Sequence, residues 1–298
     1  MNQPSVPLLG PVKIRELAAK LNIRPTKTLG QNFVHDAGTV RRIVRDAGVE
    51  AGDHVVEVGP GLGSLTLAIL ETGAIVSAIE IDPPLAQALP STVAEVQPES
   101  AARIAVTNRD AMEVASVAYL ALPPVLEATE DFVPKHLVAN LPYNVAVPIL
   151  LTLLQTLPTL ETVTVMVQLE VADRLAAEPG SKTYGVPSVK AHWYADVWRG
   201  AKISRNVFWP VPNVDSALVH MRRHPEPVGV PRSDVFDVVD AAFAQRRKTL
   251  RQALSTWAGS AARAEEILRD AGVDPSLRGE KLTIDDFISI AQSFTKVS

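Results

Sequence analysis

The chain has 298 residues, of which 47% are hydrophobic and 21% are charged, and its formal net charge is −4. This length can bury one large hydrophobic core and a smaller one, so we expect a globular protein of one or two domains. The absence of cysteine excludes disulfides, thiolate zinc sites, iron–sulfur clusters and every mechanism that uses a sulfur nucleophile.

The N-terminal stretch MNQPSVPLLGPVKIREL lacks the charged-then-apolar order of a secretory signal, and no apolar run is long enough for a membrane helix. We therefore expect a cytoplasmic protein that does not bind a membrane. The negative net charge argues against a surface that is basic everywhere, but nucleic-acid binding needs only a local basic face.

Short β-rich runs alternate with helical or loop stretches from residue 54 to about residue 222. Apolar strands separated by helices are typical of a mostly parallel sheet covered on both faces, so the sequence predicts an α/β fold. Only a proline-rich loop separates the last two runs, and we expect these two strands to be antiparallel. The predicted strands span residues 54–58, 74–80, 103–107, 136–140, 162–169, 196–203 and 216–222.

The pattern changes to helical periodicity after a proline-rich linker that begins near residue 223. We therefore predict two domains, an α/β domain over residues 1–222 and a small all-helical domain over residues 223–298. Residues 120–135 read as a long loop with no evident role.

Two helix boundaries in the second domain carry sequence signals. Gly272 follows a helical run and suits a helix stop, while Thr283 and Asp286 have the spacing of a capping box that opens the last helix.

Three glycines, Gly59, Gly61 and Gly63, follow the first predicted strand and precede an amphipathic helix. Glycines at this place permit a tight turn and a close approach of the backbone to a ligand at the helix N-terminus. Glu80 ends the second strand, where a carboxylate can accept hydrogen bonds from both hydroxyls of a ribose. These residues predict a nucleoside-containing cofactor, and they leave open whether it is a nicotinamide dinucleotide or another adenosyl compound.

Asp110 follows the third strand, at the carboxyl edge of the predicted sheet where open α/β folds bind ligands. Its carboxylate could accept a hydrogen bond from an adenine amino group. The alternative is an aspartate that caps the following segment.

The tetrapeptide Asn140-Leu141-Pro142-Tyr143 ends the fourth strand and fits the methylation of the exocyclic amine of a base. The lone pair of that nitrogen is conjugated into the ring. If the Asn140 side-chain oxygen and the Leu141 carbonyl each accept one N–H, the nitrogen can pyramidalise and turn its lone pair toward an electrophile. Pro142 fixes the backbone and removes a competing donor, and Tyr143 offers a ring for stacking, worth about 1–3 kcal/mol. The structural alternative is that Asn140 caps the next helix and that Tyr143 belongs to the core.

A sulfonium electrophile has a neutral leaving group, so this chemistry requires no strong general base. The target base must leave its stack to reach such a pocket. We predict that Phe208, on the proline-rich loop, provides a second stacking ring, with Trp209 as the competing choice.

The sequence resembles the ribosomal small-subunit RNA adenine dimethyltransferases almost from end to end. The matching stretches include LGQNFVHD, VVEVGPGLGSLT, AIEID, NRDAM, VANLPYN, VFWPVPNVDSALV and AFAQRRKTLRQAL. The resemblance implies a Rossmann-like class I methyltransferase domain, S-adenosylmethionine as cofactor, and methylation of two adjacent adenosines in the 3′-terminal hairpin of the rRNA. It also implies a pre-30S particle as partner and no metal. The cofactor contacts that it implies are Asn32, Val34, Gly59, Gly61, Glu80, Asp110 and Asn140.

Basic residues cluster at the start of the helical domain, where Arg246, Arg247, Lys248 and Arg251 lie close together in the sequence. We predict that these four bind RNA phosphates. The post-strand motif with Glu170, Arg174, Lys182 and Tyr184 also matches the family but receives no chemical role.

Three alternatives remain open: a large-subunit rRNA adenine methyltransferase of the antibiotic-resistance type, an N6-adenine DNA methyltransferase, and a non-catalytic ribosome-assembly factor. A dehydrogenase would explain the glycines but not residues 140–143. Nothing in the sequence reads as a self-complementary apolar seam, so we expect a monomer.

Overall fold

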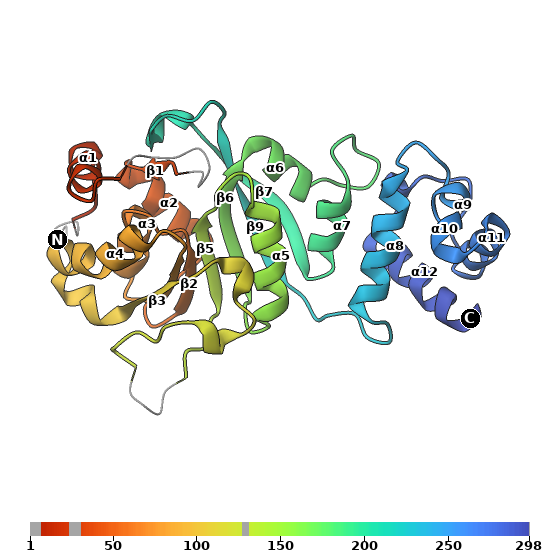
Figure 1. Ribbon diagram of the computed structural model, residues 1–298, viewed down its shortest axis with the longest axis horizontal. Coiled ribbons are helices and arrows are strands. Elements are labelled where there is room, and N and C mark those ends of the chain that lie inside the picture. The colour runs from red at the N-terminus through yellow and green to blue at the C-terminus, as the bar shows by residue number, and fades with distance from the viewer. Residues whose placement is uncertain (1–6, 24–30, 127–130, 298) are drawn as a thin grey trace. The chain divides into compact units, whose positions relative to one another are not determined.

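The computed structural model describes residues 7–23, 31–126 and 131–297 (Figure 1). The first two residues of the LGQNFVHD motif and residues 127–130 of the predicted loop lie outside these ranges. None of the described helices is both long and apolar enough to span a bilayer.

A seven-stranded sheet forms the centre of the α/β unit. β2 pairs in parallel with β3 and β5, β3 with β4, and β5 with β6, whereas β9 runs antiparallel to β6. In spatial order the strands are β4 (Ile104–Asn108), β3 (Ile75–Glu80), β2 (His54–Val58), β5 (His136–Asn140), β6 (Thr162–Gln168), β9 (Ser216–Arg223) and β7 (Ala195–Ile203). Each predicted strand is confirmed, with ends that differ by at most one residue.

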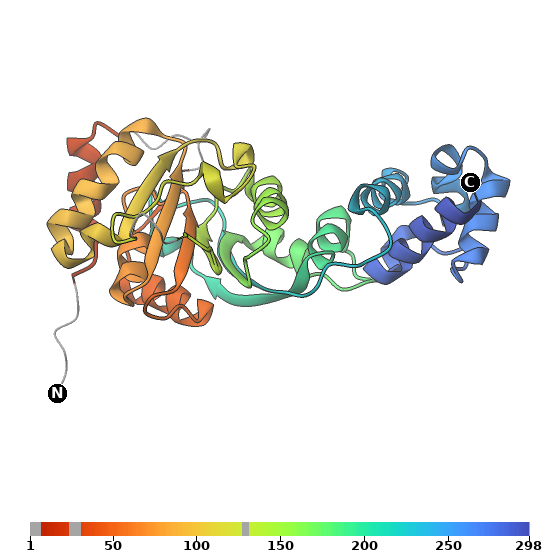
Figure 2. The ribbon, with the colours of Figure 1, turned by 90° about the horizontal axis from the view of Figure 1, so that it is seen from below.

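Helices cover both faces of this sheet (Figures 1 and 2). Crossover connections between parallel strands are right-handed, and the strand order runs one way from β2 to β4 and the other way from β5 to β6. α3 and α4 therefore lie on one face and α5 on the other. The helical segments up to α5 are α1 (Pro11–Lys20), α2 (Ala37–Ala47), α3 (Ser64–Glu71), α4 (Pro83–Val96), η1 (Pro98–Arg103), η2 (Ala111–Glu113), η3 (Val117–Tyr119) and α5 (Ala146–Thr156).

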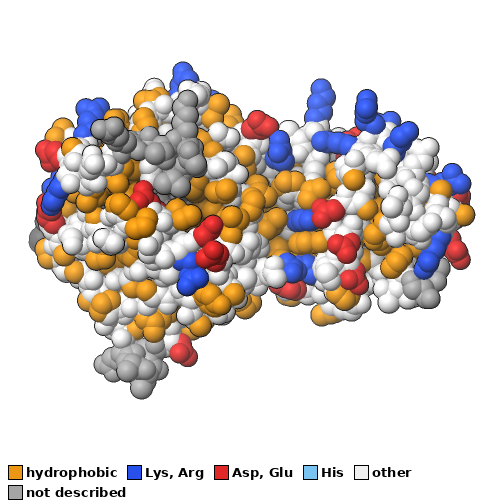
Figure 3. All heavy atoms as spheres, viewed as in Figure 1, with side chains coloured by type: hydrophobic (Ala, Val, Ile, Leu, Met, Phe, Trp, Pro, Cys, Tyr) orange, Lys and Arg blue, Asp and Glu red, His pale blue; other side chains and the backbone are white. Residues whose placement is uncertain are grey.

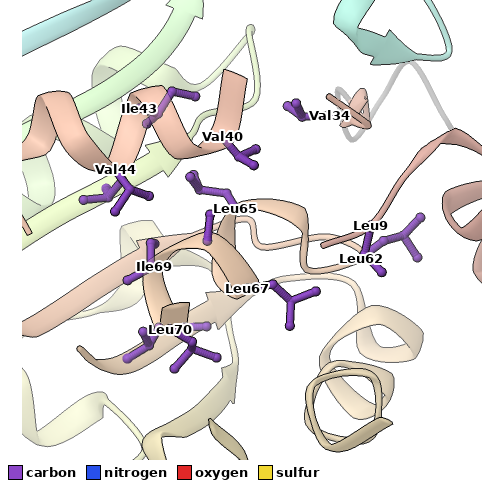
Figure 4. Packing of buried hydrophobic residues seen from close by; sticks show 14 of the residues in the cluster. Leu9, Val34, Val40, Ile43, Val44, Leu62, Leu65, Leu67, Ile69 and Leu70 are labelled. Carbon is purple, nitrogen blue, oxygen red and sulfur yellow. The ribbon is translucent and has the colours of Figure 1, made fainter. Parts of the chain in front are cut away.

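The packing of α2 against α3 illustrates how the apolar pattern builds the core (Figure 4). Val40, Ile43 and Val44 recur at helical spacing and are buried, so one face of α2 is apolar. The Asp36 carboxylate caps this helix by accepting from the Thr39 backbone N–H at 2.7 Å. Each aliphatic side chain buried here contributes about 1.5–3 kcal/mol.

A second, two-stranded sheet joins distant parts of the sequence. β1 (Phe33–Val34) pairs antiparallel with β8 (Phe208–Trp209), so the N-terminal motif lies beside the proline-rich loop that precedes β9. The sequence did not predict this sheet, because two-residue strands carry no periodic signal. η4 (Arg205–Val207) leads into it.

The chain divides into two compact units, residues 1–172 with 198–222 and residues 173–197 with 223–298. The predicted boundary after residue 222 coincides with one of these borders. Residues 173–197, however, group with the helical unit and not with the α/β domain where the sequence placed them. The reason is packing inside that unit: the buried Tyr184 donates its hydroxyl hydrogen to the Leu282 carbonyl at 2.7 Å, and α7 packs against α8.

Two helix boundaries of the helical unit lie where the sequence signals predict. The Thr283 and Asp286 capping box is present, with the Thr283 N–H donating to the Asp286 carboxylate at 2.8 Å. Gly272 has a φ of 73° just beyond α11, as a helix stop requires. Its helices are α7 (Val186–His192), α8 (Arg232–Ala244), α9 (Leu250–Ala253), α10 (Ser255–Ala258), α11 (Ala261–Asp270) and α12 (Ile284–Val297), with η5 (Gly279–Lys281) before α12, and α6 (Leu169–Leu175) crosses from the first unit.

Candidate functional site

A cavity of about 200 Å³ lies at the carboxyl ends of β2, β3, β4 and β5. This is the edge at which open α/β sheets bind ligands. Most of the predicted site residues line it: Asn32, Val34, Gly59, Gly61, Glu80, Asp110, Asn140 and Pro142.

The glycine turn forms the floor of the cavity beneath the N-terminus of α3. Gly59 and Gly61 have φ angles of 64° and 56°, a left-handed conformation that favours glycine. A Cβ at Gly61 would stand only 2.9 Å from the Phe33 ring. The Gly59 N–H donates to the Ile79 carbonyl at 2.9 Å and the Gly61 N–H to the Glu80 carboxylate, so the turn fixes the residues that line the cavity.

Glu80 holds a fixed carboxylate at the end of β3. Its Oε2 accepts from the Gly61 N–H at 3.1 Å and its Oε1 from the Asp82 N–H at 2.9 Å. The side chain is buried, and burial raises the pKa of the carboxyl, whereas these two N–H groups lower it. These two bonds fix the orientation of the carboxylate. Each oxygen therefore presents its free lone pair in a set direction, as accepting from the hydroxyls of a ribose requires.

Asp110 acts as the cap that the sequence offered as one alternative: its Oδ1 accepts from the Met112 N–H at 2.9 Å. The carboxylate still lines the cavity, so capping and ligand binding are compatible. Ile81 and Met112 flank this end of the cavity and are 49% and 43% exposed. Two exposed apolar side chains at one cavity offer faces to a flat ring.

Asn140 is held by the N-terminal motif. Its Nδ2 donates to the Asn32 backbone carbonyl at 3.1 Å, and because that partner only accepts, the bond fixes which side-chain atom is nitrogen. Among the described residues, Oδ1 then has no hydrogen-bond partner. The amide therefore presents an acceptor at the cavity wall, and Asn32 positions it.

The other members of the tetrapeptide have separate places. Leu141 is buried and its N–H donates to the Met166 carbonyl at 3.0 Å, while within the described ranges its own carbonyl accepts no hydrogen bond. Pro142 lines the cavity. Tyr143 is half-buried, does not line the cavity, and forms a 2.8 Å hydroxyl contact with the buried Ser216.

The structure corrects the expectation for Phe208. Its side chain is 1% exposed and belongs to the hydrophobic core, because strand pairing of β8 with β1 turns the ring inward. A base cannot stack on it in this conformation. Trp209, the competing choice, is half-buried and stacks on Phe33 with ring centroids 6.3 Å apart.

Sequence reasoning missed Glu57, which lies in β2 and lines the cavity. The side chain is 1% exposed, and within the described part of the chain neither carboxylate oxygen forms a hydrogen bond of good geometry, although the Thr66 hydroxyl of α3 lies near it. Burial, together with the negative charge of Glu80, outweighs the lowering effect of the Thr66 hydroxyl and raises the pKa of this carboxyl to about 8. An acidic residue within an apolar strand was the available signal, because such residues are almost never buried without a partner.

The four predicted RNA-binding residues fall into two groups. Arg246 donates to the Lys182 and Tyr184 carbonyls at 2.8 Å each and pairs with Glu280, and Arg251 pairs with Glu265 at 2.7 Å. Arg247 and Lys248 are exposed and have no ion-pair partner in the described ranges. Lys and Arg side chains project from the surface of the helical unit (Figure 3).

Comparison with known proteins adds to this geometry. The family model described as ribosomal RNA adenine dimethylase matches residues 22–296. The chain is 61% identical over 288 residues to the ribosomal RNA small subunit methyltransferase A of Streptomyces avermitilis, covering 96% of this chain and 94% of that protein. It is 62% identical over 286 residues to the protein of the same name from Thermobifida fusca, covering 96% of each.

Two solved structures share the fold. A dimethyladenosine transferase from Plasmodium falciparum superposes with a TM-score of 0.72 at 20% identity, over 89% of this chain and 98% of that chain. The 23S rRNA methyltransferase ErmE superposes with a TM-score of 0.62 at 26% identity, over 89% of this chain and all of that chain.

Proposed function

The chain belongs to the ribosomal RNA adenine dimethylase family, and from this premise we propose how its cavity performs the reaction. The protein is a small-subunit rRNA methyltransferase that acts on adenine. In our proposal it transfers methyl groups from S-adenosylmethionine to N6 of two adjacent adenosines in the 3′-terminal hairpin, within a pre-30S particle in the cytoplasm, as a monomer. The observation that carries the proposal is the Asn140 amide, fixed with its oxygen unengaged at the cavity wall.

The cavity suits the cofactor because its polar groups match both ends of that molecule. Glu80 would accept from the ribose hydroxyls, and the Asp110 carboxylate from the adenine amino group. Ile81 and Met112 would cover the two faces of the adenine ring. The buried Glu57 carboxylate, whose oxygens form no hydrogen bond of good geometry with the described residues, would accept from the ammonium of the methionine end.

The methyl acceptor would be held at the Asn140 end of the cavity. When bound, S-adenosylmethionine supplies a methyl group on a sulfonium whose leaving group is a neutral thioether. The Asn140 Oδ1 and the Leu141 carbonyl would each accept one N–H of the target amine, which localises the lone pair on nitrogen. As the N–C bond forms and the methyl leaves sulfur, the nitrogen would become cationic and would lose one of these protons to solvent. Asn32 positions the amide through its carbonyl, and Pro142 keeps a competing N–H away.

Stacking of the target base would fall to Tyr143, since the Phe208 ring is buried. The Tyr143 hydroxyl is anchored by Ser216, so the ring position is restricted. Burial raises the pKa of this phenol, which therefore stays protonated at neutral pH. A neutral ring matches a role in packing and not in proton transfer.

The direct test is to incubate the protein with labelled S-adenosylmethionine and undermethylated 30S particles and to map the modified nucleotides. We expect label on two adjacent adenines near the 3′ end of the rRNA. Label on cytosine or on protein, or none on adenine, would reject the proposal. Undermethylated 50S particles are the matched control, since ErmE shares the fold and its name specifies 23S rRNA.

Docking of RNA on the helical unit rests on Arg247 and Lys248. Reversing both charges (Arg247→Glu with Lys248→Glu) is expected to weaken particle binding about tenfold or more and to reduce the slope of log affinity against log salt by about 2. Filter binding over a salt series measures both quantities. Cofactor affinity should stay unchanged.

Arg246→Gln is the contrasting variant. It removes the bonds to the Lys182 and Tyr184 carbonyls, so we expect a lower melting temperature with an almost unchanged salt slope. An unaltered slope for the double charge reversal would place the RNA-docking surface elsewhere.

A further inference from the structure

An exposed tryptophan lies on the edge strand of the α/β unit, away from the cavity. Trp198 in β7 is 43% exposed, whereas Trp193 is 2% exposed and Trp209 and Trp257 are half-buried. Its indole stacks on the His220 ring of β9, with centroids 5.7 Å apart and an interplanar angle of 29°. The proposed function assigns no role to this residue.

The His220 ring under the Trp198 indole is held in place by its neighbours. His220 is buried, and its Nδ1 lies 3.0 Å from the Thr164 hydroxyl. A Cβ at Gly200 would clash with the His220 ring, so only glycine lets the imidazole lie against β7. Burial lowers the pKa of His220, while the Asp46 carboxylate raises it. The imidazole is therefore neutral at pH 7 and acts as packing for the indole.

Arginines surround this support. The Arg222 guanidinium stands 5.9 Å from the Trp198 ring centroid, and its side chain is exposed. α2 packs against β6, whose Thr164 hydroxyl lies 3.0 Å from the His220 ring, and Arg42 and Arg45 of that helix pair with Asp46 at 3.6 and 3.8 Å. Three arginines stand against two aspartates, Asp46 and the exposed Asp196 two residues before Trp198 on the same face of β7, which leaves a small excess of positive charge on a chain whose net charge is −4.

The chemistry of this surface matches an RNA backbone. A guanidinium that rests on an indole is pre-organised, so its N–H groups lose less entropy on binding a phosphate. Arginine also forms bidentate bonds with phosphate oxygens. The indole adds apolar area for a ribose or for the edge of a base. Excess positive charge beside an exposed aromatic ring favours nucleic acid over an apolar protein partner.

The position of the surface defines which part of an RNA it contacts. Arg222 pairs in register with Thr162, the first residue of β6, whereas Ser216 pairs with Gln168 at the end of that strand. The two ends of β9 are six residues apart, which is about 20 Å. A nucleotide inserted at the carboxyl edge of the sheet therefore cannot also contact Arg222.

We propose that Trp198 and Arg222, bordered by Arg42 and Arg45, form a second RNA-contact surface that binds backbone phosphates of the rRNA away from the nucleotides that are methylated. The proposal rests on the proposed function and names a contact that helps to select a large structured RNA. The proposal thus assigns catalysis to the cavity and part of the affinity for rRNA to the surface around Trp198.

The test uses the full-length protein with Trp198→Ala, Arg222→Glu and the double variant. Affinity is measured across a salt series for undermethylated 30S particles and for deproteinised small-subunit rRNA. We expect the double variant to bind both about tenfold more weakly with a salt slope reduced by about 1. The kcat at saturating particle concentration and the affinity for S-adenosylmethionine should be unchanged, while KM rises.

Two matched variants control for charge and shape. Arg269→Glu reverses the same charge on the exposed face of α11, and Trp198→Phe keeps an aromatic ring; both should retain most of the affinity. Unchanged affinity and slope in the double variant would overturn the proposal. Weakened binding to particles but not to deproteinised rRNA would also overturn it, because the partner would then be a ribosomal protein. If the wild-type protein does not methylate adenine at all, the proposed function fails, whereas the binding series still reports on this surface.

Discussion

Replacing Asn140 with alanine is expected to lower kcat for adenine methylation by at least about 10²-fold, while affinity for S-adenosylmethionine falls only moderately. The expected loss follows from removing an acceptor that would be aimed at the reacting amine, an effect of about 3 kcal/mol in comparable sites. Cofactor affinity is spared because Glu57, Glu80 and the glycine turn remain in place. Single-turnover transfer and calorimetric binding measure the two quantities separately.

Two further variants make this result specific. Asn144 also lines the cavity, so Asn144→Ala tests whether any lost amide has the same effect, and we expect a much smaller change. Asn140→Asp keeps an acceptor but cannot donate to the Asn32 carbonyl when ionised, so its activity should fall between those of wild type and Asn140→Ala. Normal turnover in Asn140→Ala would remove the assigned role.

The second large effect is expected at Glu57, and it depends on pH. With a pKa of about 8 this carboxyl is mostly protonated at pH 7 when no ligand is bound. If its ionised form accepts the cofactor ammonium, binding must release a proton, about 0.9 per cofactor at pH 7. Cofactor affinity should therefore rise about tenfold per pH unit up to pH 8 and then level off.

Calorimetry in two buffers of different ionisation enthalpy measures the released proton directly. Glu57→Gln should bind the cofactor about 10–100-fold more weakly at pH 8 and release no proton, because a charged partner is lost. Glu99→Gln, an exposed carboxylate in the same unit, is the control and should behave as wild type. Proton release that persists in Glu57→Gln would assign the titration to another group.

The same raised pKa predicts how the unliganded protein responds to pH. A folded-state pKa above the ordinary value of 4.5 means that the folded protein holds this proton more tightly than the unfolded chain. Its contribution to the free energy of unfolding is fully present below pH 4.5 and is lost as pH rises to about 8, by about 3 kcal/mol at pH 7. The stability of Glu57→Gln relative to wild type should therefore increase over this range in denaturant titrations. A difference that does not vary with pH would contradict the assignment.

Much of the fold could be predicted because its signals are local. Strands such as residues 54–58 and 136–140 are short apolar runs between turn residues, and the observed ends match the predicted ones. The capping box at Thr283 and the helix stop at Gly272 require only the residues next to them. By contrast, the assignment of residues 173–197 to the helical unit depends on which distant residues bury Tyr184. The local sequence does not show which residues these are.

The candidate site divides in the same way. Residues at strand ends, such as Glu80, Asp110 and Asn140, could be found because parallel strands bring their carboxyl ends to one edge of a sheet. Glu57 was missed because it lies inside a strand, where side chains are normally covered by the neighbouring layer of the fold. The sequence does not show that this layer leaves a cavity beside Glu57. Phe208 was misplaced because its burial is decided by pairing with a strand that lies far away in the sequence.

The amino-acid sequence by itself determined the seven strands of the main sheet, the residue types at its carboxyl edge and the family of the chain. The strands, helices and edge residues follow from periodicity, turn chemistry and spacing, which act over a few residues at a time, whereas the family follows from the resemblance of several long motifs. Only the tertiary structure decided that Asn32 holds the Asn140 amide, that Arg246 supports a neighbouring loop and that Glu57 is buried at the wall of the cavity. Hydrogen bonds and burial between distant segments depend on their arrangement in space, so these facts appear only once the chain is folded.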